Sequence, residues 1–178
     1  ALYEHQSFNV MNATLTLLGA LLAHASANVF NNYFDYKMGV DQITVKTPFS
    51  GGVDVIVGGQ VKPSSAFLFG LVCLLGATLI GAYFILIFPW PMLIIVAYGG
   101  FSIFLYVPCI SRIPGVSEIV AGTSFGLMAL GTYVIQTGSV SATATSVFFL
   151  VSLLVGILLF LNEFPDAEVD KAAGRRHL

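Results

Sequence analysis

The sequence predicts an all-α protein that crosses a lipid bilayer several times as a bundle of transmembrane helices. Of its 178 residues, 57% are hydrophobic and only 9% are charged, with a mean hydropathy of +0.90. A soluble domain carries about 25% charged residues, so this chain cannot cover itself with a water-soluble surface. Within lipid, only a backbone that satisfies its own hydrogen bonds is stable, which favours helices.

Five segments have roughly the length and composition of a membrane-spanning helix, which needs about 20 mostly apolar residues. Turn residues separate them, because proline and glycine interrupt the apolar runs. Pro89 and Pro91 follow the second segment, Pro108 and Pro114 bracket the loop after the third, and Gly138 follows the fourth. The segments are 8–34, 65–88, 92–107, 116–136 and 143–161.

Small residues inside these runs indicate helix packing. Glycine is enriched where transmembrane helices approach closely, and we expect this role for the glycines within the segments. They are Gly70, Gly76, Gly81, Gly99, Gly100, Gly122, Gly126 and Gly131.

The distribution of charge predicts the topology. Successive crossings alternate sides, and all 7 Lys and Arg residues follow the first, third or fifth segment. Cytoplasmic loops carry an excess of Lys and Arg, so we expect this side to be cytoplasmic in a multi-pass protein of the inner or plasma membrane. Apart from Glu4, the acidic residues fall on this side too. If loops were simply polar, both sides would carry charge, but the opposite loops are polar without charge. The concentration of charge on one side therefore favours a metal and phosphate site there.

The end of the first segment carries a polar stripe. Steps of four, three and four residues place His24, Asn28, Asn31 and Asp35 on one face of a helix, and Asp41 follows. We interpret His24 as a structural residue that hydrogen-bonds a neighbouring helix, a common role for polar residues in membranes. Asn31, Asp35 and Asp41 are interpreted as functional, because carboxylates stacked at a helix end repel each other unless a cation is present.

The end of the fifth segment repeats the pattern. Asn162, Asp166 and Asp170 are four residues apart and share a face. Each helix end therefore offers an amide and two carboxylates, the hard oxygen donors that suit Mg²⁺, whereas no cluster of Cys and His suggests zinc. The candidate metal ligands are Asn31, Asp35, Asp41, Asn162, Asp166 and Asp170.

Basic and aromatic residues lie in loops on the same side. Lys46 precedes a Gly-Gly pair at 51–52, which is no P-loop but is suited to cover a diphosphate and balance its charge. Arg112 lies in the loop after the third segment, and Lys171 follows the second acidic motif. Tyr106 is either a residue of the site or a member of the interfacial aromatic belt.

The two acidic motifs resemble those of the UbiA superfamily of intramembrane aromatic prenyltransferases. Its first motif begins with Asn, with one Asp four residues later and another beyond, which Asn31, Asp35 and Asp41 match, while Asn32 stands where many members have Asp. Its second motif, two Asp residues four apart, matches positions 166 and 170. The stretches 35–41 and 131–138 are similar to menaquinone-pathway members, which act on 1,4-dihydroxy-2-naphthoate.

The resemblance implies nine helices, so we expect residues 1–178 to form a single but incomplete domain lacking one preceding and about three following helices. It also implies transfer of a prenyl group from its diphosphate to an aromatic, quinone-precursor-like acceptor, with Mg²⁺ as cofactor, the bilayer as surroundings and no nucleic acid as partner.

The residue roles implied by the resemblance follow the chemistry of the diphosphate. Asn31 and the aspartates would hold Mg²⁺, which makes diphosphate a leaving group. Lys46, Arg112 and Lys171 would bind the diphosphate and its developing charge, and Tyr106 would shield the allylic cation. Asp35 or Asp166 would take the ring proton, and the choice between them stays open.

Two other classes of protein compete with this interpretation. A CDP-alcohol-type phosphotransferase also displays aspartates at a helix end, but its Asp-Gly and Ala-Arg spacing is absent here. A cation transporter would place carboxylates near the middle of the bilayer, whereas here they crowd one interface.

Overall fold

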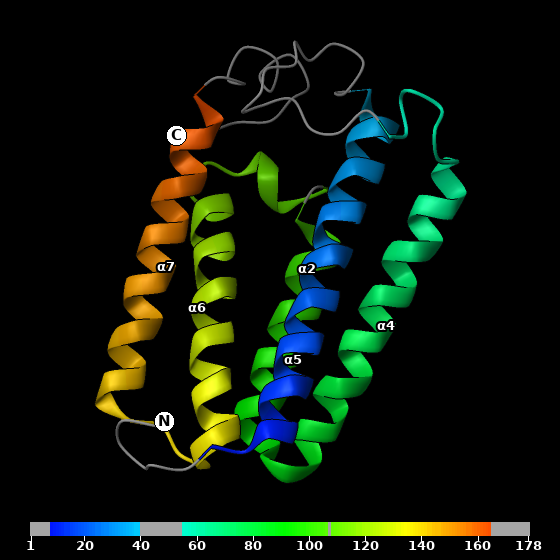
Figure 1. The fold of residues 1–178 in the computed structure, drawn as a ribbon. Helices are drawn as coiled ribbons and strands as arrows, with labels where there is room; N and C mark the ends of the chain where they lie inside the picture. Colours follow the sequence, from blue (N-terminus) through cyan, green and yellow to red (C-terminus); the bar gives the residue numbers. More distant parts are fainter. Residues whose placement is uncertain (1–7, 40–54, 107, 165–178) are drawn as a thin grey trace.

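A computed structural model of the chain describes residues 8–39, 55–106 and 108–164, except for the side chain of residue 163. These ranges form five α-helices and one short 3₁₀ helix, without a strand among them (Figure 1). The predicted all-α bundle is therefore confirmed. The elements are α2 (Val10–Met38), α4 (Pro63–Ile87), α5 (Pro89–Leu105), η1 (Ile110–Arg112), α6 (Val116–Thr137) and α7 (Ala142–Glu163).

Four of these helices, α2, α4, α6 and α7, are long and apolar enough to cross a membrane, and α5 is a shorter apolar helix of 17 residues. The structure corrects two boundaries. The first helix continues to Met38 and ends at Gly39, whose φ of 76° suits a residue without a side chain. Pro89 and Pro91 belong to the first turn of α5 rather than to a separate turn, because proline is tolerated where no helical N–H bond is needed.

The length of α2 determines where its polar end lies. Its 29 residues span about 43 Å, whereas the hydrocarbon core of a bilayer is about 30 Å thick. The last turns of α2, which carry Asp35, therefore reach beyond the core when the rest of the helix crosses it. At the other end, the Asn9 side chain caps the helix by accepting a hydrogen bond from the backbone N–H of Asn12 at 3.0 Å.

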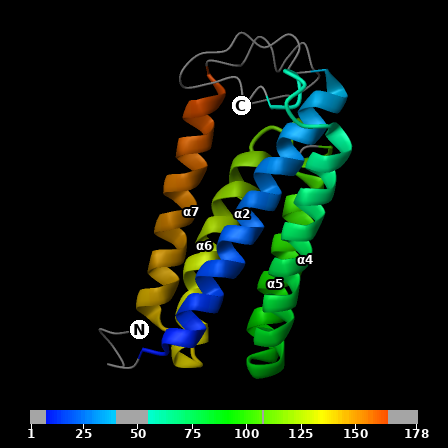
Figure 2. The ribbon, with the colours of Figure 1, turned by 45° about the vertical axis from the view of Figure 1, so that its right-hand side comes forward.

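The ends of the elements gather as the charge pattern predicted. The end of α2, the start of α4, η1, the start of α6 and the end of α7 all lie at one end of the bundle, the upper end in Figures 1 and 2. Lys37, Lys62 and Arg112 belong to these ends. The opposite end contains the turns at 87–89 and 138–141, and its described residues carry no Lys or Arg.

The α6 and α7 helices pack very closely. A Cβ atom added at Gly122 would overlap the carbonyl oxygen of Ser152, and one added at Gly126 would overlap the hydroxyl oxygen of Ser152. These glycines thus allow the contact that the sequence predicted. The prediction is wrong for Gly99 and Gly100, since a Cβ on either would have nothing within 4 Å.

The α2 helix is held to its neighbours by polar contacts at several heights. The Ser26 hydroxyl, fully buried, donates to the carbonyl of Gly70 in α4 at 2.9 Å. At the lower end, the backbone N–H of Asn9 donates to Oε1 of Gln136 in α6 at 2.9 Å, and Nδ2 of Asn12 donates to the carbonyl of Ile135 at 3.2 Å.

Candidate functional site

The polar stripe on α2 runs along an unbroken helix, as its spacing predicted. His24, Asn28 and Asn31 are exposed, whereas Asp35 is only 8% exposed. Nδ2 of Asn28 donates to the carbonyl of His24 at 3.1 Å, and Nδ2 of Asn32 donates to the carbonyl of Asn28 at 2.8 Å. Both bonds stay within α2, so these amides do not link helices to one another.

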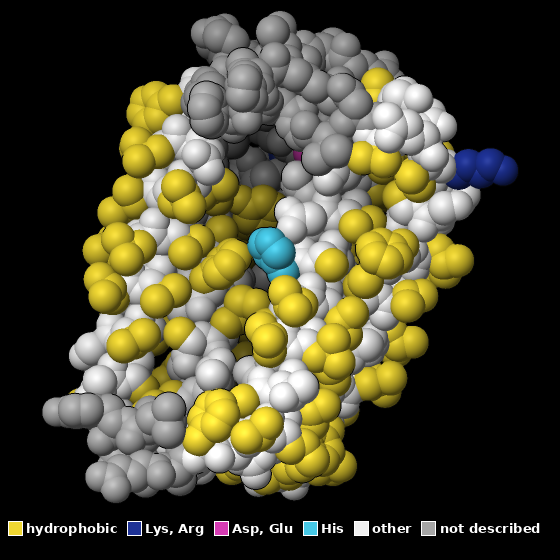
Figure 3. Space-filling view, in the orientation of Figure 1, with side chains coloured by type: hydrophobic (Ala, Val, Ile, Leu, Met, Phe, Trp, Pro, Cys, Tyr) yellow, Lys and Arg dark blue, Asp and Glu magenta, His cyan; other side chains and the backbone are white. Residues whose placement is uncertain are grey.

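His24 contacts a neighbouring helix through its ring. Its imidazole lies edge-on to the ring of Phe125 in α6, with 6.0 Å between the ring centroids. The contact crosses the space between α2 and α6, where the space-filling view shows a hollow with a histidine at its edge (Figure 3). His24 is the only histidine among the described residues.

Arg112 reaches the last turn of α2, the helix that carries Asp35, although the two residues are 77 positions apart. Nη2 of Arg112 lies 3.2 Å from Sδ of Met38, one turn beyond Asp35 on α2. The short helix η1 therefore carries the guanidinium to the end of the polar stripe. Arg112 is exposed, so its remaining donors are accessible to an anionic ligand.

Aromatic side chains pack below this polar end. Phe30, fully buried, contacts the rings of Phe34, Phe67 of α4 and Phe104 of α5, with centroid distances of 5.4 to 6.3 Å. Tyr106 ends α5 and is half-buried, and its carbonyl accepts the backbone N–H of Ser111 at 2.8 Å. Tyr106 thus lies in the loop that carries Arg112, as expected from the sequence.

The second acidic motif is described only at its start. Asn162 is exposed in the last turn of α7, at the same end of the bundle as Asp35 (Figure 1). Five other predicted site residues lie outside the described ranges, namely Asp41, Lys46, Asp166, Asp170 and Lys171.

The donors at this end fit a hard divalent cation rather than a soft one. Asp35, Asn31 and Asn162 offer carboxylate and amide oxygens, which Mg²⁺ prefers. The part of the chain that the structure describes contains no group of three His, Cys, Asp or Glu residues able to hold a metal.

One buried carboxylate was not among the predicted site residues. Glu118 lies in the first turn of α6 and is 6% exposed. Its Oε2 accepts a hydrogen bond from the Ser117 hydroxyl at 2.6 Å, and its Oε1 has no hydrogen-bond partner among the described residues. The sequence does contain one signal for Glu118, since it directly precedes an apolar run. That pattern is equally typical of a solvated acidic residue at a helix start, so it does not indicate a buried site.

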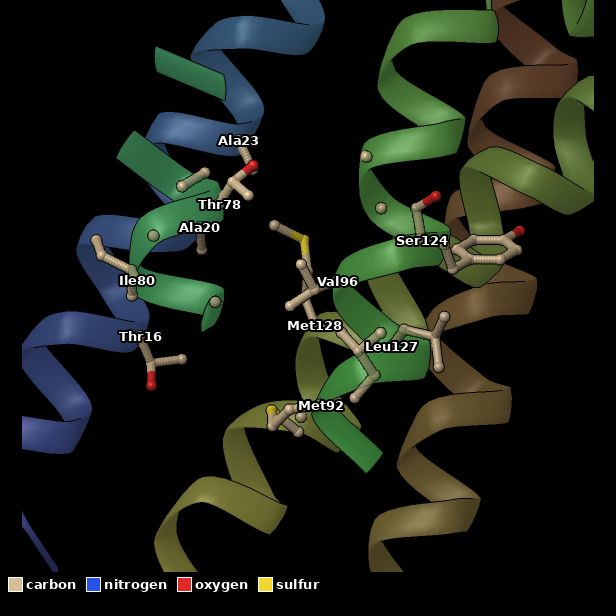
Figure 4. Close-up of a pocket in the computed structure, with 18 of the residues that line it drawn as sticks. Thr16, Ala20, Ala23, Thr78, Ile80, Met92, Val96, Ser124, Leu127 and Met128 are labelled. Carbon is tan, nitrogen blue, oxygen red and sulfur yellow. The ribbon is translucent and has the colours of Figure 1, made fainter. Parts of the chain in front are cut away.

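An apolar cavity of about 230 Å³ lies below the polar end and is lined by residues of α2, α4, α5 and α6. Ala20 and Thr78 lie on one side of it, and Val96 and Leu127 on the other (Figure 4). Gly99 and Gly100 form part of its lining, which explains why a Cβ there would meet nothing within 4 Å. His24 and Phe125 also line it, so the cavity reaches the hollow between α2 and α6.

The fold and this site define a polytopic helical membrane protein with a polar centre at one end of the bundle and an apolar cavity beneath it. The chain belongs to the UbiA prenyltransferase family, whose sequence model matches residues 1–178. The predicted resemblance to this family is thereby confirmed, and the phosphotransferase and transporter alternatives lose their support.

Similar proteins include prenyltransferases with different acceptors. The chain is 28% identical to 1,4-dihydroxy-2-naphthoate octaprenyltransferase of Bacillus subtilis, over 91% of this chain and 52% of that protein. It is 27% identical to human UbiA prenyltransferase domain-containing protein 1, over 96% and 51%. It is 31% identical to protoheme IX farnesyltransferase of Aquifex aeolicus, over 76% and 44%.

The chain spans about half the length of the curated relatives that it matches. No solved structure matches it significantly.

Proposed function

We propose that the protein transfers a prenyl group from a prenyl diphosphate to an aromatic, quinone-precursor-like acceptor in a reaction that depends on Mg²⁺. The observation that carries this proposal is that buried Asp35 and the contact of Arg112 with Met38 share the end of α2, above an apolar cavity. Such a site accommodates a charged head and an apolar tail at once. Family membership and the transferase names of the relatives support it.

Asn31, Asp35 and Asn162, together with Asp41, Asp166 and Asp170, would hold the cation. Bound Mg²⁺ neutralises a diphosphate and makes it a better leaving group. Arg112 binds phosphate oxygens through its planar fork of N–H donors, and Lys46 and Lys171 add charge from the neighbouring segments.

The proposed reaction has three steps, namely loss of diphosphate, bond formation to the acceptor and loss of a ring proton. The bond between prenyl C1 and the diphosphate oxygen breaks, and its electron pair leaves with the diphosphate. Arg112 stabilises the charge that develops there. A ring carbon of the acceptor forms the new bond to C1, and the ring then loses a proton to Asp35 or Asp166. Tyr106, in the loop that leads to Arg112, is suited to stabilise the allylic cation.

The prenyl chain occupies the cavity between α2, α4, α5 and α6 in this proposal. The lining is almost entirely apolar, and glycines at 99 and 100 leave room beside α5. Lipid tails are as apolar as the helices, so moving the prenyl chain from lipid into the cavity gives little hydrophobic free energy. The cavity therefore selects the chain by its length and shape. The polar end faces the cytoplasm of an inner or plasma membrane, as the distribution of Lys and Arg favours.

The test is prenyl transfer by the full-length protein in lipid nanodiscs, with a radiolabelled prenyl diphosphate. We expect transfer to 1,4-dihydroxy-2-naphthoate that requires Mg²⁺ and stops in EDTA, and less transfer to a single-ring hydroxybenzoate. A protein that binds no prenyl diphosphate with or without Mg²⁺, while it folds normally by circular dichroism, would refute the proposal.

A further inference from the structure

The carboxyl group of Glu118 is buried with one oxygen satisfied and the other not. Oε2 is held by the neighbouring Ser117 hydroxyl, while Oε1 has no partner among the described residues and no contact with solvent. A buried polar atom without a hydrogen bond costs free energy, and a carboxylate oxygen costs more than a neutral one. The site therefore requires a donor that the described helices do not supply.

The helical faces show where this donor must come from. Glu118 and Phe125 are seven residues apart on α6, about two turns, so they share a face. Phe125 contacts His24 of α2 across the hollow between α2 and α6, here called the groove. His24 shares its face of α2 with Asp35, which lies eleven residues or about three turns further along. Asp35 and Glu118 thus stand on the two faces that confront each other across the groove between α2 and α6.

The same contact gives the relative depth of the two carboxylates. Along its own helix, Asp35 lies about 16 Å above the level where His24 and Phe125 meet, and Glu118 lies about 10 Å above it, at 1.5 Å per residue. Glu118 is therefore about 6 Å deeper in the bundle than Asp35. This level lies just below the end of α2 where the diphosphate would bind, and it is where an acceptor ring has to approach the reacting carbon to about 3 to 3.5 Å.

Among the described residues, no side chain of a neighbouring helix donates a hydrogen bond to Oε1 of Glu118. On α7, the residue that approaches is Gly156, whose added Cβ would lie 3.2 Å from the carbonyl oxygen of Glu118. On α5, the Tyr98 hydroxyl donates to the carbonyl of Val120 at 3.4 Å. Arg112, six residues before Glu118, directs Nη2 to Met38 instead.

We infer that Oε1 of Glu118 binds a hydroxyl group of the acceptor ring and so positions the ring for attack on the prenyl carbon. A carboxylate oxygen accepts hydrogen bonds. The prenyl chain has no donor, and the diphosphate is an anion that a carboxylate repels. An electron-rich hydroxylated ring supplies the O–H donor that Oε1 lacks. The ring must also lie at about the depth of Glu118 to reach the prenyl carbon. This inference rests on the proposed prenyl transfer and names the residue that recognises its acceptor.

The experiment compares Glu118→Ala and Glu118→Gln with wild type in the full-length protein, with 1,4-dihydroxy-2-naphthoate as acceptor. The alanine variant should raise the KM for the acceptor roughly 10- to 100-fold, because a hydrogen bond to a charged group is lost, and leave the KM for prenyl diphosphate within about twofold. The glutamine variant, which keeps an oxygen acceptor, should recover most of this loss. Ser152→Ala is the matched control, because Ser152 is the other buried side chain with an unpartnered oxygen among the described residues and should change neither KM.

A second measurement separates recognition from structure. Binding of the acceptor alone, followed by its fluorescence without Mg²⁺ or prenyl diphosphate, should weaken by the same factor in Glu118→Ala. An acceptor whose hydroxyls are methylated should bind wild type and variant equally, since it offers no O–H to lose.

Three results would overturn the inference while wild type still transfers prenyl groups. They are an unchanged acceptor affinity in Glu118→Ala, a raised Mg²⁺ requirement that marks Glu118 as a metal ligand, and an equal loss with the methylated acceptor. Absence of transfer by wild type, with acceptor binding still dependent on Glu118, would instead refute the proposed function alone.

Discussion

Filling the apolar cavity from α5 should shorten the prenyl chain that the protein accepts. Gly100→Leu adds four carbon atoms, nearly the five of one isoprene unit, at a position where an added Cβ has nothing within 4 Å. The cavity measures about 230 Å³, so the new side chain takes the space of about one unit. Forcing extra carbons into a filled apolar site costs about 1 to 3 kcal/mol, which lowers kcat/KM roughly 5- to 150-fold for a donor long enough to fill the cavity.

The effect should depend on donor length. Donors of one or two isoprene units leave the cavity partly empty, so their kcat/KM should change less than about twofold, within the scatter of neutral substitutions. The assay is prenyl transfer in nanodiscs with a series of diphosphates of increasing chain length. Ala97→Leu is the matched control, because it adds carbons at an exposed position of the same helix.

The stability of the folded state provides an internal check. Replacing a helical glycine removes a helix-weakening residue, a gain of up to about 1 kcal/mol, so Gly100→Leu should not lower the melting temperature in detergent. An equal loss of activity with short and long donors at unchanged stability would refute the assignment of the cavity to the prenyl chain.

Four further predictions concern the polar end and the helix contacts. Asp35→Asn should reduce transfer by at least about 100-fold without restoration by excess Mg²⁺, since the carboxylate charge is lost at a buried position; activity near wild type in the nanodisc assay would contradict this. Arg112→Ala should raise the KM for prenyl diphosphate more than that for the acceptor, which steady-state kinetics with each substrate varied would reveal. Gly126→Leu should destabilise the bundle by several kcal/mol because it separates α6 from α7, and a melting temperature equal to that of wild type would contradict the packing. His24→Ala should reduce transfer less than either Asp35→Asn or Arg112→Ala does in the same nanodisc assay.

The fold was predictable because its signals are local. Apolar runs of membrane length and the glycine at 138 placed the helices to within about one turn, and Gly138 indeed ends α6 with a φ of 72°. The start of α5 was misplaced, because Pro89 is compatible both with a turn and with the first turn of a helix. The four-residue spacing of the polar stripe was a reliable signal for the same reason.

The site was predictable only where its residues follow one helix. Asp35 and Asn31 were identified from their spacing, and Arg112 from the side of the membrane on which it falls. Its contact with Met38 depends on the path of η1, which no periodicity reveals. Glu118 was missed because burial is a tertiary property, and the same residue at a helix start is usually solvated. The roles of Gly99 and Gly100 could not be predicted either, since a glycine in a transmembrane helix marks a contact or a cavity equally well.

The glycine contact between α6 and α7 has a mechanical consequence. These two helices touch backbone to backbone at positions 122 and 126, so they can shift only as one rigid unit. The α2 helix is joined to that unit by hydrogen bonds at its lower end, from Asn9 and Asn12. Higher up, the described contacts are the ring contact of His24 with Phe125 and the contact of Met38 with Arg112. Widening of the groove therefore pivots about the lower end and is greatest at the end that carries Asp35, as in a hinge. Release of a bulky prenylated product between α2 and α6 would then need the His24–Phe125 and Met38–Arg112 contacts to part.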